Sequence, residues 1–203
     1  ASFGKSNSEI RSSIAALIIG SLRLFLVFEI YKRFPMVEIE ILTDRMIYTL
    51  NSRIFAKVMV KADKLHYKNC KHPGEIPREN WGKVIFLGMP DLIRRIRKYV
   101  DTLTDTRANF MSSSISSFEM LNEGVHKGSA LMKIADMYGI DHKNTAAIGD
   151  YFNDYDMLKT VGLSACCGQA PKAMHEIAKF HACHCNRGAV ADLLEYIMND
   201  YTD

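Results

Sequence analysis

Four residues in the C-terminal half of this sequence have side chains and a spacing that suit catalysis: Asp150, Asn153, Asp154 and Lys127. Asp150 follows a short apolar run that ends in Gly149, and Asn153 and Asp154 come shortly after it, where a helical pattern begins. Mg²⁺ takes oxygen ligands and usually binds one or two carboxylates together with water and substrate phosphate. Open α/β sheets bind ligands at the carboxyl ends of their strands. The segment therefore predicts metal-assisted phosphate chemistry.

The lysine, Lys127, lies directly before a glycine at the start of another helical pattern. A lysine in this place is a compact cation that can meet a phosphate or a carboxylate. The helix predicted over residues 129–138 has four apolar residues at core-facing spacing: Leu131, Ile134, Ala135 and Tyr138. One helix and one short strand separate Lys127 from Asp150, so we expect both to reach one edge of a sheet.

The two motifs together resemble the haloacid dehalogenase superfamily of phosphatases, and specifically its Cof-type branch. The first motif is Lys-Gly-x-Ala-Leu from Lys127, and the second is Gly-Asp-x-x-Asn-Asp-x-x-Met-Leu from Gly149. The resemblance continues through residues 163–167, 169–175 and 186–192. Both motifs in this order and at this spacing are specific, whereas a Gly-Asp dipeptide alone is a common loop feature.

The resemblance implies a role for each of these residues. Asp150 would hold Mg²⁺, and Asp154 would lie at or beside the metal, through water or by orienting Lys127. Lys127 would neutralise the attacking carboxylate and the transferring phosphoryl group. Asn153 would contact the phosphate or the nucleophile. The neighbouring His126 is more often a structural residue than a catalytic one.

Each of these roles has an ordinary structural alternative that the sequence leaves open. Asp150 could be a turn or cap residue at the end of a strand, and Asn153 could be a helix cap. Asp154 could be a first-turn carboxylate that the helix dipole stabilises. Lys127 could be a solvated surface lysine.

The nucleophile motif of the superfamily has no counterpart in this sequence. That motif is Asp-x-Asp-Gly-Thr; its first Asp forms an aspartyl-phosphate and its second Asp handles protons. The only Asp-x-Asp here runs from Asp154 to Asp156 and is followed by Met157. The Ser/Thr phosphate-binding motif also lacks a convincing counterpart. We therefore expect the chain to begin after the first half of the catalytic domain and to show little or no turnover alone.

The predicted fold class is α/β, with a partial Rossmann-like core, its C-terminal half, preceded by an α+β cap domain. Residues 1–12 are expected to be disordered or added during cloning, residues 13–122 to form the cap, and residues 123–203 to form the half-core. In the cap, residues 36–42 alternate apolar and acidic side chains, as a half-buried strand does. The further elements predicted for the cap are a turn at 43–45, strands over 46–50, 84–87, 108–112 and 118–121, helical or mixed structure over 52–65, a polar loop over 68–80 and a helix over 91–103.

Composition limits the class of protein. The chain has 203 residues, 48% of them hydrophobic and 24% charged, which is typical of a globular protein of one or two domains. A formal net charge of +3 is too small to indicate a nucleic-acid partner. Five cysteines, an odd number without a secretory leader pattern, favour a reducing cytoplasm.

The segment from Ile14 to Ile30 is strongly apolar, but it does not predict a membrane span. It is short for a span, and it contains Arg23 and Glu29. We expect a buried or interface helix instead. If a missing half-domain normally covers this helix, its exposed apolar surface would favour a homo-oligomer.

A cluster of histidine and cysteine near the C-terminus invites comparison with zinc sites. Its members are His181, Cys183, His184 and Cys185, with Cys166 and Cys167 as further candidates. Zinc sites usually space their ligands as Cys-x₂₋₄-Cys and His-x₃₋₅-His. The local spacing here differs, and buried free cysteines commonly act as small hydrophobic residues. The sequence therefore favours a structural role for the cluster.

Two functions from different classes follow from the sequence. The first is a Mg²⁺-dependent phosphatase that acts on small phosphorylated metabolites such as sugar phosphates, with its nucleophile outside this chain. The second is a non-catalytic degenerate homologue or partner-binding module, because without an attacking carboxylate no phospho-enzyme can form.

Overall fold

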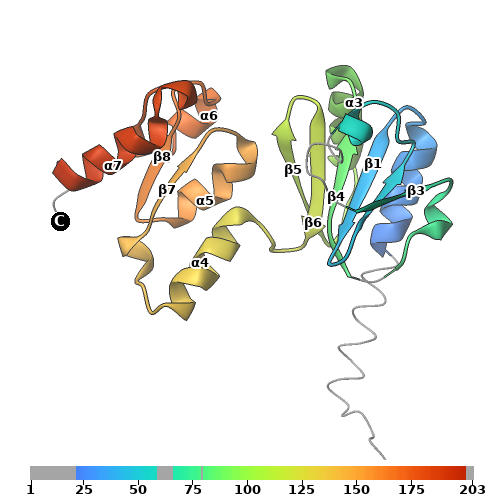
Figure 1. The fold of residues 1–203 in the computed structure, drawn as a ribbon, viewed down its shortest axis with the longest axis horizontal. Helices are drawn as coiled ribbons and strands as arrows, with labels where there is room; N and C mark the ends of the chain where they lie inside the picture. Colours follow the sequence, from blue (N-terminus) through green and yellow to red (C-terminus); the bar gives the residue numbers. More distant parts are fainter. Residues whose placement is uncertain (1–21, 59–65, 79, 200–203) are drawn as a thin grey trace, which may run out of the picture. The chain divides into compact units, whose positions relative to one another are not determined.

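The computed structural model describes residues 22–58, 66–78 and 80–199 (Figure 1). The chain divides into two compact units: an N-terminal unit of residues 1–110 and 115–123, and a C-terminal unit of residues 111–114 and 124–203. The expectation for residues 1–12 lies outside the described residues. The domain boundaries given above stay a prediction.

The N-terminal unit is built on a six-stranded sheet with the strand order β3-β2-β1-β4-β6-β5. Its strands are β1 (Glu38–Thr43), β2 (Ile47–Leu50), β3 (Tyr67–Cys70), β4 (Trp81–Leu87), β5 (Ala108–Ser114) and β6 (Ser117–Asn122). A short 3₁₀ helix, η1 (Pro73–Glu75), follows β3, and α3 (Pro90–Val100) follows β4. Strands β1, β4 and β6 are antiparallel neighbours.

The predicted alternation of β1 explains the layers of this unit. Ile39 and Ile41 are fully buried in the main core, together with residues of α3 and of the helix through residues 22–33. Successive side chains of a strand point to opposite faces, so Glu38 and Glu40 lie on the other face of the sheet. Both glutamates are buried as well, so the prediction of a half-buried strand is wrong and the strand is buried on both faces. The turn after β1 is also as predicted, because Thr43 Oγ1 accepts a hydrogen bond from the Met46 N–H.

Strand β3 corrects the prediction of a polar loop over residues 68–80. It pairs in parallel with β2, with Ile47 opposite Tyr67 and Leu50 opposite Cys70. Only Cys70 of its four residues is buried. A strand at the edge of a sheet needs backbone hydrogen bonds rather than an apolar pattern, so its polar sequence gave no sign of it.

The C-terminal unit has a three-stranded parallel sheet with the order β7-β8-β9 (Figure 1). Its strands are β7 (Ala146–Gly149), β8 (Leu163–Cys166) and β9 (Phe180–His181). Its helices are α4 (Lys127–Met137), α5 (Tyr155–Thr160), α6 (Lys172–His175) and α7 (Ala189–Asn199), with the 3₁₀ turns η2 (His142–Asn144), η3 (Phe152–Asp154) and η4 (Cys185–Arg187). Apolar side chains of α4, α5 and α6 pack with Cys166 and Ala147, whereas Leu193 of α7 packs with Leu163 and Ala165. Helices thus cover both faces of the sheet.

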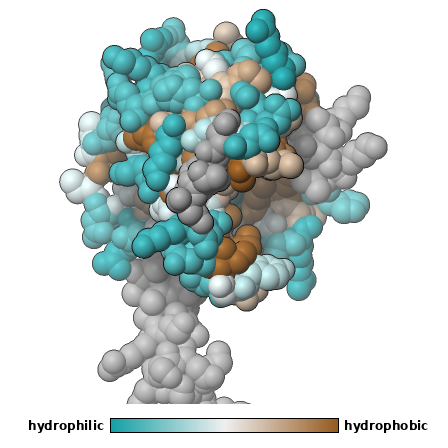
Figure 2. Space-filling view, turned by 90° about the vertical axis from the view of Figure 1, so that its left-hand side faces the viewer, coloured by the Kyte–Doolittle hydropathy of each residue, from teal (hydrophilic) through white to brown (hydrophobic). Residues whose placement is uncertain are grey.

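The core-facing side of α4 differs from the one predicted. Ala135 is buried and Leu131 packs partly, but Ile134 and Tyr138 are 52% and 76% exposed. Figure 2 shows hydrophobic residues interrupting the hydrophilic surface on the face that it presents.

The apolar segment of residues 14–30 is described only from residue 22. Residues 22–33 are helical, and Leu26, Val27 and Ile30 are buried in the core of the N-terminal unit. Within the described ranges, no helix combines the length and the apolar character needed to cross a membrane. The prediction of a buried helix holds for this part of the segment.

Candidate active site

Lys127 is the first residue of α4, and a local hydrogen-bond pattern fixes where that helix begins. His126 is the N-cap: its Nδ1 accepts a hydrogen bond from the Ser129 N–H at 3.2 Å, and the Ser129 hydroxyl oxygen accepts one from the His126 N–H at 3.1 Å. A reciprocal capping pair of this kind satisfies the free N–H groups of a helix start. Because Nδ1 accepts a hydrogen bond, His126 has the structural role that was favoured for it.

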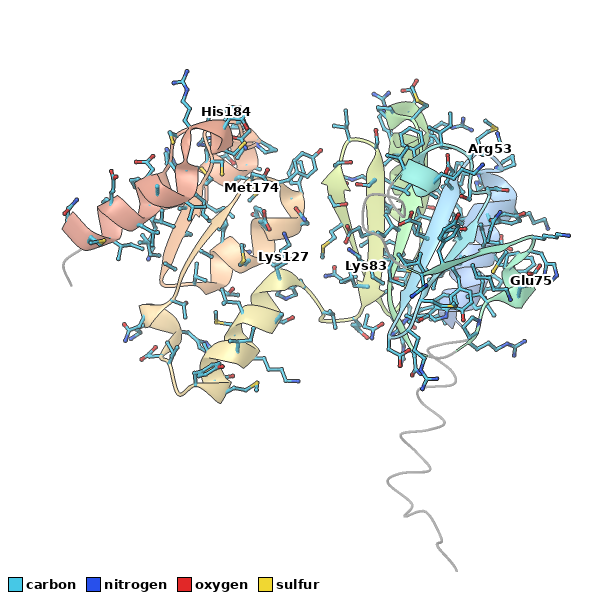
Figure 3. The ribbon with its side chains drawn as sticks, in the orientation of Figure 1. Arg53, Glu75, Lys83, Lys127, Met174 and His184 are labelled. Atoms are coloured by element: carbon cyan, nitrogen blue, oxygen red, sulfur yellow. The ribbon has the colours of Figure 1, made fainter. Side chains whose placement is uncertain are left out.

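The lysine meets a buried carboxylate. Lys127 Nζ donates a hydrogen bond of 2.6 Å to Asp154 Oδ1, and Figure 3 labels Lys127 at the start of α4. The Asp154 side chain is only 7% exposed, whereas the Lys127 side chain is 52% exposed. Charge-assisted hydrogen bonds of this length are among the stronger ones in proteins. The pair therefore fixes a cation at the surface by anchoring it to a buried acid.

The second oxygen of Asp154 holds the end of strand β7. Asp154 Oδ2 accepts a hydrogen bond from the Asp150 N–H at 3.1 Å. Both carboxylate oxygens of Asp154 are thus engaged, one with Lys127 and one with the backbone of Asp150. The side chain orients two candidate residues at once, which agrees with the orienting alternative that the sequence left open.

Two glycines allow these elements to approach closely. A Cβ at Gly149 would lie 2.5 Å from the Asp154 Cβ, and a Cβ at Gly128 would lie 2.8 Å from the Asp156 carbonyl oxygen. Real Cβ atoms do not reach such distances, so only glycine fits at either place. From the sequence, Gly149 is recognised only as part of the Gly-Asp motif, and the close approach of Asp154 explains why a glycine is needed there.

Asp150 and Asn153 present oxygen atoms that the described residues leave open. The Asp150 side chain is exposed, and within the described ranges its carboxylate forms no hydrogen bond or salt bridge. Asn153 Oδ1 is buried and has no hydrogen-bond partner among the described residues. Buried polar atoms without a partner are rare and call for an explanation. A carboxylate and an amide oxygen are each ligands of the kind that a hard cation such as Mg²⁺ takes.

The structure thus brings together three of the four residues that were predicted from the sequence, and the fourth adjoins one of them in the chain. Lys127, Asp150 and Asp154 are joined by hydrogen bonds, and Asn153 lies in η3 immediately before Asp154. All of them follow the carboxyl end of β7 or face it from α4. The arrangement can hold a cation and an ammonium group near one anionic substrate group.

Comparison with known proteins places the chain in a family. A model described as haloacid dehalogenase-like hydrolase matches residues 22–194. The HMP-PP phosphatase of Citrobacter koseri is 32% identical over 127 residues, which is 62% of this chain and 47% of that protein. The HMP-PP phosphatase of an Enterobacter species is 32% identical over 123 residues, 60% of this chain and 45% of that protein. The chain spans about half the length of these curated relatives.

Solved structures agree on the fold. A protein from Streptococcus mutans UA159 has a TM-score of 0.77 at 19% identity and covers 88% of this chain and 67% of its own length. A sugar phosphatase of haloacid dehalogenase subclass IIB has a TM-score of 0.72 at 12% identity, covering 89% of this chain and 66% of its own length. The predicted fold class, a partial Rossmann-like core preceded by an α+β cap, is confirmed.

Proposed function

Because this chain belongs to the haloacid dehalogenase-like hydrolase family, we propose that it forms part of a Mg²⁺-dependent phosphatase. The single observation that supports this proposal is the Lys127–Asp154 pair, at the end of the strand that leads into Asp150. In such an enzyme the carboxylate of one aspartate attacks phosphorus, the bond from phosphorus to the leaving oxygen breaks, and a second, protonated aspartate gives that oxygen its proton. Water then hydrolyses the aspartyl-phosphate.

The residues of this chain would take distinct parts in that reaction. Asp150 would hold Mg²⁺, which supplies positive charge against the phosphate oxygens. Lys127 would bring its ammonium group to the attacking carboxylate and the transferring phosphoryl group, a task for a point charge. Asp154 would keep Lys127 and the Asp150 backbone in place, next to the metal. Asn153 would donate an amide N–H to the phosphate or to the nucleophile.

The nucleophile, in this proposal, lies outside the given sequence. The sequence has no Asp-x-Asp-Gly-Thr motif, and the chain spans about half the length of the curated relatives that it matches. The 203-residue chain alone would then show little or no turnover, because no carboxylate of the motif type is available to attack phosphorus.

The proposed substrates are small phosphorylated metabolites such as sugar phosphates. The names of the relatives and of the similar solved structures, HMP-PP phosphatase and sugar phosphatase, support this class. The cytoplasm is the proposed location, because all five cysteines are free thiols. A homo-oligomer formed through exposed apolar surface stays a prediction.

Two measurements on one sample test the proposal: the intact mass of the protein from its native source, and its hydrolysis of p-nitrophenyl phosphate with and without Mg²⁺. We expect a mass well above that of the 203-residue chain and turnover that depends on Mg²⁺. A mass equal to that of the chain, with no turnover, would refute the phosphatase and favour a non-catalytic binding module.

A further inference from the structure

A second cluster of metal-binding side chains lies in the C-terminal unit. One ligand atom from each of Cys166, His175 and His181 lies within 4.8 Å of the others. The Cys166 Sγ is 3.2 Å from the His175 Nδ1, and the two imidazole rings meet edge to face with centroids 4.9 Å apart. None of these residues belongs to the proposed active site.

Three different elements bring the ligands together. Cys166 ends β8 and His181 ends β9, and the two residues are direct partners in the parallel register. Partners in adjacent strands carry their side chains on the same face of the sheet. His175 is the last residue of α6, which packs on that face through its buried neighbour Met174. Figure 3 labels Met174 in this part of the unit.

The surroundings of His181 resemble those of metal-binding histidines. Its Nε2 lies 3.0 Å from the carbonyl oxygen of His175. When Nε2–H donates to that carbonyl, Nδ1 carries the lone pair. Histidines that bind metals usually donate their other ring N–H to a carbonyl or carboxylate, which fixes the tautomer and the ring orientation. With Nε2–H donated to that carbonyl, Nδ1 is the ring nitrogen left to bind a metal.

The burial of the three residues also suits a metal site. Cys166 is fully buried, His175 is partly buried and His181 is exposed. An ion can thus approach from the solvent side, past His181, and reach a thiol in an otherwise apolar core. Cysteine sulfur and histidine nitrogen are both ligands that zinc takes, and three protein ligands leave a fourth position for water.

We propose that Cys166, His175 and His181 form a Zn²⁺ site at the carboxyl ends of β8 and β9. His175 and His181 have five residues between them, which fits the His-x₃₋₅-His spacing of zinc sites, but His175 was not among the clustered residues considered from the sequence. The third ligand, Cys166, joins them through the sheet register, and neither Cys183 nor Cys185 takes part.

The proposal is independent of the phosphatase reaction. Mg²⁺ prefers oxygen ligands, whereas a thiol and two imidazoles favour softer ions such as Zn²⁺. The two sites therefore differ in ligand type as well as in residues. Zinc binding can be measured in the chain whether or not it has turnover.

The experiment measures zinc bound to the purified 203-residue chain, by metal analysis after dialysis and by competition with a chromophoric chelator. We expect one Zn²⁺ per chain. Cys166→Ser and His181→Gln should each weaken binding by at least about tenfold. Cys185→Ser is the matched control, because Cys185 is an exposed thiol beside a histidine, 3.7 Å from His184 Nδ1, and it should leave binding unchanged.

Cobalt substitution identifies the ligand sulfur directly. Co²⁺ in the site should give a thiolate-to-metal charge-transfer band that Cys166→Ser removes and Cys185→Ser retains. His181→Gln, a change at an exposed position, guards against a misfolded Cys166 variant. The proposal is wrong if the chain retains no zinc after dialysis, if both single variants bind like the wild type, or if Cys185→Ser or Asp150→Asn removes the metal instead.

Discussion

Each unit of this protein buries a carboxylate that holds two segments together, but the partners of the two carboxylates differ. In the N-terminal unit, Glu38 on β1 accepts hydrogen bonds from four consecutive backbone N–H groups, those of residues 53–56, at 2.9–3.1 Å. In the C-terminal unit, Asp154 accepts one from the backbone of Asp150 and one from the ammonium group of Lys127.

The difference separates a structural acid from one that serves a site. Among the described residues, the partners of the Glu38 carboxylate are the backbone N–H groups at the start of a helical segment, so its charge stabilises the fold itself. Asp154 uses half of its acceptor capacity to position a lysine that is half exposed and can reach a ligand. A buried acid with a solvent-facing cation as its partner is the better sign of function.

The largest expected effect is at the structural acid. We expect Glu38→Gln to lower the free energy of unfolding of the N-terminal unit by about 3 kcal/mol, because a neutral amide cannot accept four N–H donors. The fluorescence of Trp81, the only tryptophan, reports urea unfolding of this unit. The exposed Glu123→Gln is the control and should change stability by less than about 0.5 kcal/mol. Equal midpoints for the two variants would contradict the role given to Glu38.

The stabilisation by the Glu38 carboxylate should also depend on pH. Burial acts to raise the pKa of Glu38, but the four backbone donors outweigh it and the pKa lies below its ordinary value. The stabilisation is then fully present above the unfolded-state pKa of about 4.3 and is lost as pH falls through the lower folded-state pKa. The stability difference between wild type and Glu38→Gln should therefore shrink in acid. A difference that stays constant down to the acid transition would show that the pKa is not lowered.

A pair of glycine substitutions compares packing in the two units. Gly149→Ala should destabilise the C-terminal unit by about 1–3 kcal/mol, because the new Cβ would meet Asp154 at 2.5 Å. Gly82→Ala in β4 is the matched control, since the nearest atom there is 3.7 Å away. Hydrogen exchange of peptides from each unit measures the destabilisation that each substitution causes. Similar effects of the two changes would mean that the close approach at Gly149 is not needed.

A smaller effect is expected from the ion pair of the site. A double-mutant cycle of Lys127→Met and Asp154→Asn should give a coupling free energy of about 1 kcal/mol, because one partner is buried and the other half exposed. The same cycle on Arg45 and Asp44, an exposed pair at 3.9 Å, should give less than about 0.5 kcal/mol. If both cycles give the same coupling, the burial of Asp154 adds nothing to the pair.

The sequence predicted most of what its local patterns encode. The alternation of residues 36–42 and the turn at Thr43 gave the β1–β2 hairpin, and the two motifs gave the meeting of Lys127 with the Asp150 segment. The motif resemblance implied that Asp154 acts either at the metal through water or by orienting Lys127. Its hydrogen bonds to Lys127 and to the Asp150 backbone have the geometry of the orienting role.

What the sequence did not predict depends on contacts that only the fold makes. Tyr67–Cys70 becomes a strand because β2 offers it a free edge, and its own residues are mostly exposed and polar. The exposure of Ile134 follows from which side of α4 meets α5, a matter of packing rather than of helical period. Cys166 and His181 become neighbours through the register of β8 and β9, which no ligand spacing along the chain reveals.

The most direct test of the proposed function is a substitution at Asp150 that should remove activity while changing stability very little. Asp150→Asn, made in the protein expressed from its full native reading frame, should alter stability by less than about 0.5 kcal/mol, since the side chain is exposed. It should abolish Mg²⁺-dependent phosphatase turnover, whereas Asp156→Asn in the first turn of α5 should keep it. Turnover and Mg²⁺ dependence that survive Asp150→Asn unchanged, or a wild type without Mg²⁺-dependent turnover, would contradict the site described for this chain.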